Sequence, residues 1–299
     1  MILLLGPMAD QALANVCARL AARNADLMLV HPEAGENDWN VTWSTEAGRV
    51  GDRVRIGKRT VPLGDITSVY LRGVGNRSGA TVRERMLSAS LWELVDGLPA
   101  LVVNRRRASS TNTSKPYQQR LIAEYGFRVP KTLVTTVPEE ALAFYESCHG
   151  CVIYKSVSGE RSIVRPLTSA DLGRLDQIKC CPVQLQEMVP GVDIRVHTVG
   201  DRLFATEVTS DTADYRYARR DNGQRTMRAI ELRPELDTRC LALAKGLGLV
   251  MSGIDLRRTP DGDYVCFEVN TSPGFMFFES CTGQRIGDAV ADLLRAGRA

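Results

Sequence analysis

Residues 252–275, with the sequence SGIDLRRTPDGDYVCFEVNTSPGF, constrain the fold of this chain more than any other stretch. Two runs of alternating apolar residues flank the segment Pro260-Asp261-Gly262-Asp263, whose residue types are typical of a tight turn. An alternating run on each side of such a turn predicts a β-hairpin. Three polar side chains, Asp255, Glu268 and Asn270, interrupt a pattern that otherwise indicates a buried hairpin.

Counting back from this turn predicts which residues lie opposite one another. The expected cross-strand pairs are Thr259–Tyr264, Asp255–Glu268 and Gly253–Asn270. Residues i and i+2 of a strand share a face, so the two carboxylates and the amide point the same way. The opposite, apolar face is expected to hold Ile254, Leu256, Phe267 and Val269.

The three polar residues of the hairpin are candidate metal ligands. Two like charges directly opposed on a sheet destabilise it unless a cation lies between them. Hard oxygen ligands that converge on one point suit Mg²⁺. We therefore predict a magnesium site at Asp255, Glu268 and Asn270, and the alternative is an ordinary solvent-exposed strand face.

A second predicted strand carries polar residues with the same period. In VDIRVHT, Asp193, Arg195 and His197 share one side of the strand. An arginine beside an acidic cluster either forms a plain ion pair or stabilises oxygens that gain charge in phosphoryl transfer. His197 is interpreted as a structural or substrate-facing residue.

The bulk properties exclude few classes of protein. The chain has 299 residues, of which 44% are apolar and 24% charged, and its net charge is +3. That charge gives no argument for a nucleic-acid partner. The start, MILLLGPMAD, is interpreted as a buried strand rather than a signal peptide. No run approaches the roughly 18 apolar residues of a membrane span. We therefore expect a cytoplasmic protein with no membrane or nucleic-acid partner.

The eight cysteines are too scattered for a disulfide scaffold. Cys148 and Cys151 form a C-x-x-C, but the adjacent Cys180 and Cys181 have the wrong spacing for a second zinc-binding pair. Reduced, structural thiols are the favoured interpretation.

Three regions follow one another along the chain. Residues 1–108 alternate strands with helices, which predicts an α/β domain with a parallel sheet. Residues 109–187 predict a small α+β domain, after a polar linker at 108–114. Residues 188–299 predict longer antiparallel strands, including a hairpin that turns at Gly200-Asp201, and a closing helix.

One glycine-containing motif and two lysines bear on nucleotide binding. RGVGNRSG, starting at Arg72, has the spacing G-x-G-x-x-x-G, one residue too long for a dinucleotide fingerprint, so a turn is the better interpretation. Lys115 follows Ser114 at the expected start of a helix, where a basic side chain opposes the helix dipole. Lys155 lies in an apolar strand run, where a charge is costly. Both charges therefore need a reason, and for Lys115 an ordinary first-turn position with its charge in solvent is the alternative.

Taken together, four segments resemble the ATP-grasp superfamily, most nearly the RimK-like ligases and among them the graspetide (microviridin-type) synthetases, which are peptide macrocyclases. The segments are SKPYQQRLIAEYGFRVPKTLVTT, VIYKSVSGE, QLQEMVPGVDIRVHTVGDRLFATEV and SGIDLRRTPDGDYVCFEVNTSPGFMFFE. They cover residues 110–280. The resemblance implies an ATP-grasp fold: an N-terminal α/β domain, a central α+β domain and a C-terminal antiparallel-sheet domain, with ATP between the last two.

The resemblance also implies roles for individual residues. Those expected near the nucleotide are Lys115 and Lys155 at the phosphates, Gly159 in the phosphate-covering loop, the backbone of Glu187 and Val189 at the adenine, and Asp193 at the ribose. Those expected in catalysis are Arg195 and Arg216, with one or two Mg²⁺ on Asp255, Glu268 and Asn270. Those expected at the substrate are Ser272 and Gly274, with Arg72 in an electrostatic grip. Two departures from the family pattern are Ala218, where an Asn is usual, and the single glycine of SVSGERS.

The implied reaction is ATP-dependent activation of a carboxylate, followed by attack of a hydroxyl or amine. Six arginines in 211–233 suit an acidic precursor peptide, although a solvated charged face is the alternative. The first hypothesis is a macrocyclase that forms ester or amide links between side chains, working as a homodimer. The second is a ligase that adds a free amino acid to a small carboxylate substrate. The third is a nucleotide-binding protein without ligase activity.

Overall fold

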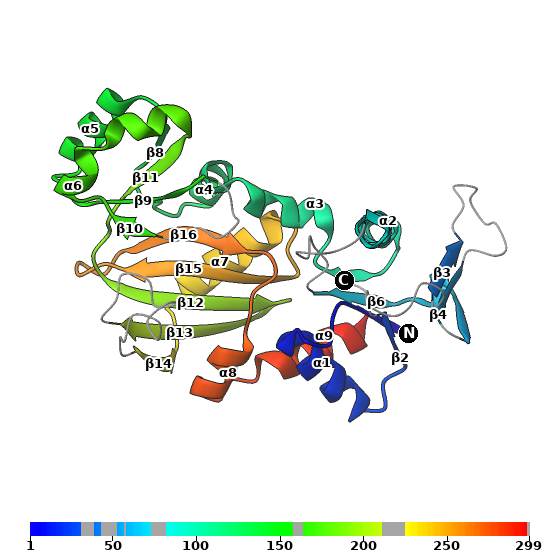
Figure 1. Ribbon diagram of the computed structural model, residues 1–299. Helices are drawn as coiled ribbons and strands as arrows, with labels where there is room; N and C mark the ends of the chain where they lie inside the picture. Colours follow the sequence, from blue (N-terminus) through cyan, green and yellow to red (C-terminus); the bar gives the residue numbers. More distant parts are fainter. Residues whose placement is uncertain are drawn as a thin grey trace.

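The computed structural model describes residues 1–30, 39–42, 53–56, 58–72, 82–157, 164–210 and 225–297, and within them the strands form four sheets (Figure 1). The chain is a mixed α/β protein, as predicted. None of the helices in these ranges combines the length and the apolar character that crossing a membrane requires.

The N-terminal region contains the predicted parallel sheet, with strand order β2-β1-β6-β7. The strands are β1 (Ile2–Leu5), β2 (Leu27–Val30), β6 (Ser68–Leu71) and β7 (Leu101–Val103), and the helices are α1 (Gln11–Ala21) and α2 (Val82–Gly97). Asp10 caps α1 by accepting a hydrogen bond from the Leu13 amide. Every residue of β1 and β6 is buried, and all of them except Ser68 are isoleucine, leucine, valine or tyrosine, which explains why the sequence pattern identified these strands.

A small antiparallel sheet in the same region was not predicted. It consists of β3 (Trp39–Thr42), β4 (Arg53–Ile56) and β5 (Arg59–Pro62), followed by the 3₁₀ turn η1 (Leu63–Asp65). Each strand has four residues, which is too short for a period of two to stand out from chance.

The segment predicted as a polar linker, 108–114, is largely helical. It contains the end of α3 (Arg106–Ser109) and the 3₁₀ turn η2 (Ser110–Thr113). The Ser110 hydroxyl donates to the Arg107 carbonyl over 2.7 Å, and the Thr113 hydroxyl donates to the Ser110 carbonyl over 2.7 Å. The polar residues that suggest a linker therefore stabilise the turns, because their hydroxyls reach carbonyls three residues back. Helix α4 (Lys115–Glu124) follows directly.

The central region is a four-stranded sheet with the order β10-β9-β11-β8, covered on one face by helices. Its elements are β8 (Thr132–Thr135), α5 (Pro138–Ser147), β9 (Val152–Ser156), β10 (Arg165–Pro166), α6 (Ser169–Leu172), η3 (Leu175–Cys180) and β11 (Val183–Glu187). A small apolar core lies between this sheet and α5. The expectation of a compact α+β unit here agrees with these elements.

The C-terminal sheet has five antiparallel strands in the order β14-β13-β12-β15-β16. They are β12 (Val192–Val199), β13 (Arg202–Ser210), β14 (Arg225–Ile230), β15 (Met251–Arg258) and β16 (Tyr264–Asn270). The predicted hairpin between β12 and β13 turns at Gly200, whose φ is +56°. Helix α7 (Pro234–Gly246) packs its buried residues against one face of this sheet, which leaves the other face for polar side chains.

Helices α8 (Met276–Thr282) and α9 (Ile286–Ala296) lead the chain back to the N-terminal region. Figure 1 shows α9 beside α1, and both contribute to one apolar core. Arg19 of α1 pairs with Glu279 and with Asp288, the latter over 2.5 Å. The hydroxyl of Ser68 donates to the Leu294 carbonyl over 2.7 Å. The two ends of the chain thus share one packed unit.

Candidate active site

The predicted pairing of the two hairpin carboxylates is confirmed. Asp255 of β15 lies opposite Glu268 of β16, and Gly253 lies opposite Asn270. On the other side of β15, Arg195 of β12 lies opposite Asp255. Directly paired residues share a face of the sheet, so the candidate metal ligands and the arginine meet on the face away from α7.

The predicted turn of this hairpin is wrong by one residue. Arg258, not Thr259, pairs with Tyr264. The loop therefore has one more residue, Thr259, at its first end, and it is closed by a hydrogen bond from the Thr259 amide to the Asp263 carbonyl over 2.9 Å. A second bond, from the Gly262 amide to the Thr259 carbonyl, also over 2.9 Å, tightens the loop.

A β-bulge at Phe267 offsets that error. Leu256 pairs with Cys266 on the turn side of the bulge, whereas Asp255 pairs with Glu268 beyond it. The prediction that Phe267 lies on the apolar face is also wrong. Cys266 occupies that place and is fully buried in the core under α7, while Phe267 is partly exposed.

One amide and one guanidinium hold the two carboxylates together. Asn270 Nδ2 donates to Asp255 Oδ2 over 3.0 Å and to Glu268 Oε1 over 3.4 Å. Arg195 Nη1 lies 2.5 Å from Asp255 Oδ1. These bonds converge on a partly buried spot, where charged hydrogen bonds are stronger than in open solvent.

The chemistry of this donor set fits Mg²⁺. The two carboxylates lie side by side. Asn270 now turns its Nδ2 toward them, and a flip of this side-chain amide by about 180° would present its oxygen to the same spot. Within the described ranges, no group of three or more His, Cys, Asp or Glu side chains could hold a metal. The candidate set here has two carboxylates, with an amide as its third member.

Arg195 is held in place by the shape of its surroundings. Its side chain is 8% exposed, and its guanidinium carbon lies 5.6 Å from the centre of the Phe278 ring. Gly253 leaves the room that it needs, because a Cβ at that position would lie 2.5 Å from Arg195 Nη2 and 2.7 Å from Pro273 Cβ. The position of the Arg195 guanidinium therefore requires a residue without a side chain at 253, on the neighbouring strand.

His197 is a structural residue of this site rather than an acid or base. It is fully buried, its Nε2 lies 3.2 Å from the Gly274 carbonyl, and its ring meets the Phe278 ring edge-on at 4.9 Å. Burial, and then the nearby Arg195 charge, hold the pKa of His197 well below its usual value. The imidazole is therefore neutral at physiological pH and donates its Nε2 proton to that carbonyl.

Arg72 reaches the predicted substrate loop from the N-terminal sheet. Its Nη1 donates to Ser272 Oγ over 2.8 Å and to the Pro273 carbonyl over 3.0 Å. Its Nη2 lies 3.2 Å from Asp10 Oδ2. Together with the His197 bond, these contacts fix residues 272–274 from two sides. The substrate roles of Arg72, Ser272 and Gly274 stay predictions.

Lys155 lies on a buried polar face of the central sheet. Its side chain is 8% exposed and donates from Nζ to Gln186 Oε1 over 3.1 Å. Gln186 in turn donates to the Thr132 hydroxyl over 3.1 Å. Gln184, which pairs with Lys155 across the strands, is fully buried on the same face. The alternation of the strands therefore places the Lys155 ammonium beside the side-chain amides of Gln184 and Gln186. Such a group of N–H donors is suited to binding a phosphate.

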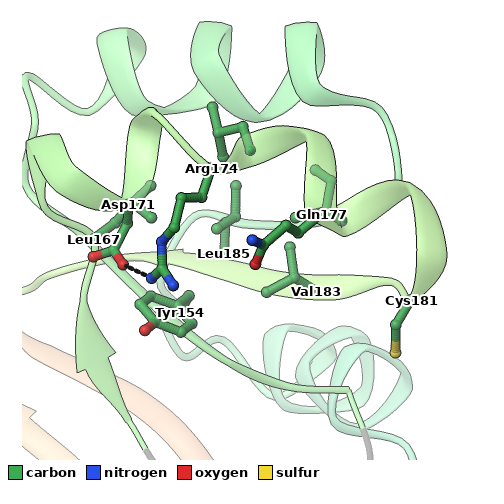
Figure 2. A pocket seen from close by; sticks show the side chains of 10 residues that line it. Tyr154, Leu167, Asp171, Arg174, Gln177, Cys181, Val183 and Leu185 are labelled. Carbon is green, nitrogen blue, oxygen red and sulfur yellow. Dashed lines mark hydrogen bonds and ion pairs between the residues drawn. The ribbon is translucent and has the colours of Figure 1, made fainter.

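The other face of the central sheet holds a separate hollow of about 190 Å³ (Figure 2). Leu185 and Val183 of β11 form its floor, and the Asp171–Arg174 ion pair at 2.7 Å lies beside Tyr154. Because neighbouring residues of a strand point to opposite faces, the sheet separates this hollow from Lys155.

Helix α4 brings Lys115 to the edge of the hairpin. Gln118, one turn further along, donates from Nε2 to the Val269 carbonyl over 2.8 Å and accepts from the Val269 amide over 2.9 Å. Val269 lies between the candidate metal ligands Glu268 and Asn270. This pair of bonds fixes the start of α4, and with it Lys115, relative to those ligands.

The segment that joins the central and C-terminal sheets carries the predicted adenosine contacts. The Glu187 amide donates to the Lys131 carbonyl over 3.0 Å. The Val189 carbonyl accepts from Arg257 Nη1 over 2.9 Å, and Asp193 Oδ1 lies 2.6 Å from Arg257 Nη2. Two of the three predicted contacts thus share one arginine.

Two predicted residues, Gly159 and Arg216, lie outside the described residues, and their roles stay predictions. The same holds for part of the arginine-rich stretch. Of its described members, Arg228 lies 2.6 Å from Glu207 Oε1, and Arg233 donates to the Gly262 carbonyl over 3.0 Å. The substrate grip assigned to this stretch also stays a prediction.

The eight cysteines are free thiols. Cys240 and Cys266 are buried in the core beneath α7, and burial raises the pKa of Cys240 to about 12. Both behave as small apolar residues there.

Sequence reasoning missed Gln118, Arg257 and Asn104. Asn104 donates to the carbonyls of Met251 and Thr271, both over 2.6 Å. It thereby joins the end of β7 to the open end of the hairpin, where β15 begins and β16 ends. A polar residue directly after a buried strand was the available signal for Asn104. Gln118 and Arg257 act through pairing across elements, which residue spacing alone does not reveal.

A family model described as a RimK-like ATP-grasp domain matches residues 113–294. A probable alpha-L-glutamate ligase of Pseudoalteromonas translucida (strain TAC 125) is 27% identical over 202 residues, which is 64% of this chain and 66% of that protein. A probable alpha-L-glutamate ligase of Trichodesmium erythraeum (strain IMS101) is 26% identical over 212 residues, 66% of each. The chain spans about two thirds of the length of these curated relatives.

Solved structures match over almost the whole chain. The ATP-grasp ligase PsnB, complexed with a phosphomimetic variant of its minimal precursor, Mg and ADP, has a TM-score of 0.81 and 26% identity, covering 99% of this chain and 98% of that one. The macrocyclase MdnC from Microcystis aeruginosa MRC, bound with precursor peptide MdnA, has a TM-score of 0.82 and 20% identity, covering 98% and 99%. The predicted ATP-grasp fold is confirmed.

Proposed function

The chain belongs to the RimK-like ATP-grasp family, and from this membership we propose that it is an ADP-forming carboxylate ligase that macrocyclises a peptide. Its proposed substrate is an acidic, ribosomally made precursor peptide whose Asp or Glu side chains are joined to hydroxyl or amine side chains. The observation that carries the proposal is the convergence of Arg195, Asp255, Glu268 and Asn270 on one face of the C-terminal sheet. The choice of a peptide is supported by the bound precursors of PsnB and MdnC.

The proposed reaction has two balanced steps. A substrate carboxylate oxygen bonds to the γ-phosphorus of ATP, and the bond from that phosphorus to the β–γ bridging oxygen breaks, giving an acyl phosphate and ADP. A hydroxyl or amine then bonds to the acyl carbon, the bond from that carbon to the phosphate oxygen breaks, and the nucleophile loses a proton. The products are an ester or amide, ADP and phosphate. No covalent enzyme intermediate is needed.

The residues of this chain supply position and positive charge. We assign Lys155 and Lys115 to the phosphates. Lys155 lies on the buried polar face of the central sheet, and the Gln118 bonds hold the start of α4, where Lys115 lies, against the hairpin. Arg195 stabilises the oxygens that gain charge in transfer. Residues 272–274, held by Arg72 and His197, orient the reacting carboxylate.

We propose that one or two Mg²⁺ ions bind at Asp255, Glu268 and Asn270, whose oxygen donors fit that ion. When bound, the metal neutralises phosphate charge. The PsnB complex, which contains Mg and ADP, supports this assignment. Gly159 in the phosphate-covering loop, Arg216 near the phosphates and a homodimeric assembly are further parts of the proposal.

A second candidate function is the addition of a free amino acid to a carboxylate substrate. The names of the curated relatives, probable alpha-L-glutamate ligases, favour it. Both functions require the same ATP chemistry and differ only in the acceptor, so the product distinguishes them.

Intact-mass spectrometry tests the proposal. The protein is incubated with ATP, Mg²⁺, a pool of acidic peptides that contain Ser, Thr and Lys, and free amino acids, while ADP is measured in parallel. ADP together with a peptide lighter by one water per bond supports the macrocyclase. ADP with a peptide heavier by an amino-acid residue supports the second candidate, and nucleotide binding without turnover on any acceptor argues for a protein with no ligase activity.

A further inference from the structure

A single guanidinium spans the segment that is expected to hold adenosine. Arg257 of β15 lies opposite Asp193 of β12. Its Nε and Nη2 lie 2.8 and 2.6 Å from Asp193 Oδ1, and its Nη1 donates to the Val189 carbonyl over 2.9 Å. The two ends of the segment 189–193 are therefore joined through one rigid, planar group.

The same segment lies tightly against β15. Gly191, at its centre, has a φ of +141°, and a Cβ there would lie 2.2 Å from the Arg258 carbonyl oxygen and 3.0 Å from Arg257 Cγ. Only glycine takes this conformation and this close approach without strain. Segment 189–193 consequently has no room to move toward β15, and its position depends on that of Arg257.

The β-bulge completes the surroundings of Arg257. By turning Phe267 out of the core, the bulge brings its ring centre to 5.3 Å from the Arg257 guanidinium carbon. A guanidinium over an aromatic face gains a cation–π interaction. The ring, the carboxylate and the carbonyl hold the Arg257 side chain, which is still 20% exposed to solvent.

We infer that Arg257 is a positioning residue for the adenosine end of the nucleotide. This inference rests on the proposed function, in which the Val189 backbone meets the adenine and Asp193 meets the ribose. Arg257 sets the separation and the orientation of those two groups through its bonds to Asp193 and to the Val189 carbonyl. A lysine in its place has one nitrogen and cannot hold both partners with the same geometry.

Three variants test the role: Arg257→Gln, Arg257→Lys and the control Arg258→Gln. Arg258 is the next residue of the strand, points to the opposite face and pairs with Glu207 over 2.7 Å. Calorimetry gives the Kd of each protein for ADP with Mg²⁺, and competition gives the Kd for inorganic tripolyphosphate. Loss of charge-assisted bonds predicts a Kd for ADP that is about 10- to 100-fold higher in Arg257→Gln. The Kd for tripolyphosphate should stay within about twofold, since that probe has no adenosine.

Arg257→Lys should give an intermediate Kd for ADP, and Arg258→Gln should match the unsubstituted protein. An Arg257→Gln protein that binds ADP normally overturns the inference. So does one that loses ADP and tripolyphosphate equally together with its melting temperature, because that result indicates a purely structural role. If the unsubstituted protein binds tripolyphosphate but not ADP, both the adenosine assignment and the inference about Arg257 fail. If it binds neither ligand, the proposed function itself fails.

Discussion

Arg72 Nη1 donates a hydrogen bond to Ser272 Oγ over 2.8 Å, which joins the carboxyl end of β6 in the N-terminal sheet to the loop after the β15–β16 hairpin. Asp10 holds the same guanidinium, and Arg72 is only 8% exposed. Replacing it with alanine leaves the partly buried carboxylate of Asp10, which is 19% exposed, without its cation. We expect Arg72→Ala to lower the free energy of unfolding by about 3–5 kcal/mol, measured by urea denaturation.

Arg59→Ala is the matched control for that measurement, because Arg59 pairs with Asp26 over 2.5 Å with both side chains about half exposed. The expected loss there is at most about 1 kcal/mol. Equal losses for the two variants would show that burial of the Arg72 pair contributes nothing.

Gly253→Ala should disable the enzyme by displacing Arg195. The new Cβ would lie 2.5 Å from Arg195 Nη2, so the guanidinium has to leave Asp255. We expect the rate of ADP formation to fall about 10²- to 10³-fold, as for the loss of one transition-state donor. The control is Gly64→Ala, where a Cβ meets nothing within 4 Å. Unchanged turnover in Gly253→Ala would argue against the role of Arg195.

Glu268→Gln should weaken the response to magnesium. The substitution keeps the shape of the side chain but removes one of the two opposed charges. We expect the Mg²⁺ concentration for half-maximal ADP formation to rise at least about tenfold, a loss typical of a weakened metal site. Asp261→Asn, at the exposed turn of the same hairpin, should leave it unchanged. A Glu268→Ala protein that still turns over ATP would refute the metal assignment.

His197 should make the protein less stable in mild acid. Its pKa lies well below the usual 6.5 because the ring is buried. Between that lowered pKa and 6.5 the unfolded chain binds one more proton than the folded protein, so stability falls as the pH drops below about 6.5, by up to roughly 1.4 kcal/mol per pH unit. Above that pH both states are neutral at this ring and the effect is constant.

Urea denaturation of His197→Asn at several pH values measures this contribution. The variant should lose less stability than the unsubstituted protein between pH of about 6.5 and 5.5. His149→Asn, at an exposed position with a φ of +52°, serves as the control. Identical pH slopes in all three proteins would rule out a buried neutral imidazole as the cause.

The hairpin illustrates how much of this site residue spacing predicts. The pairing of Asp255 with Glu268 was predicted correctly, although the turn was misplaced by one residue. The bulge at Phe267 adds one residue to β16 and so brings Glu268 back opposite Asp255. An alternating pattern carries no mark of a single extra residue, because Cys266 and Phe267 are both apolar and either can occupy the core.

The spacing of apolar and polar residues did not predict contacts between elements that are distant in the sequence. The strand of Asp193 and the strand of Arg257 were each expected, but their mutual register follows only from the folded sheet. The closing helix was predicted as well, whereas its packing against α1 was not. Family resemblance suggested roles for Lys115 and Lys155 that periodicity does not reveal.

The pairing of α1 with α9 also governs the order in which this protein is able to fold during synthesis. The first sheet is made early, yet part of its cover is a helix encoded at 286–296, and Ser68 finds its partner only at Leu294. Contacts this far apart in sequence form late and slowly. While the ribosome works through the intervening residues, one apolar side of the nascent sheet stays open to water, a state in which chaperones bind and aggregation begins.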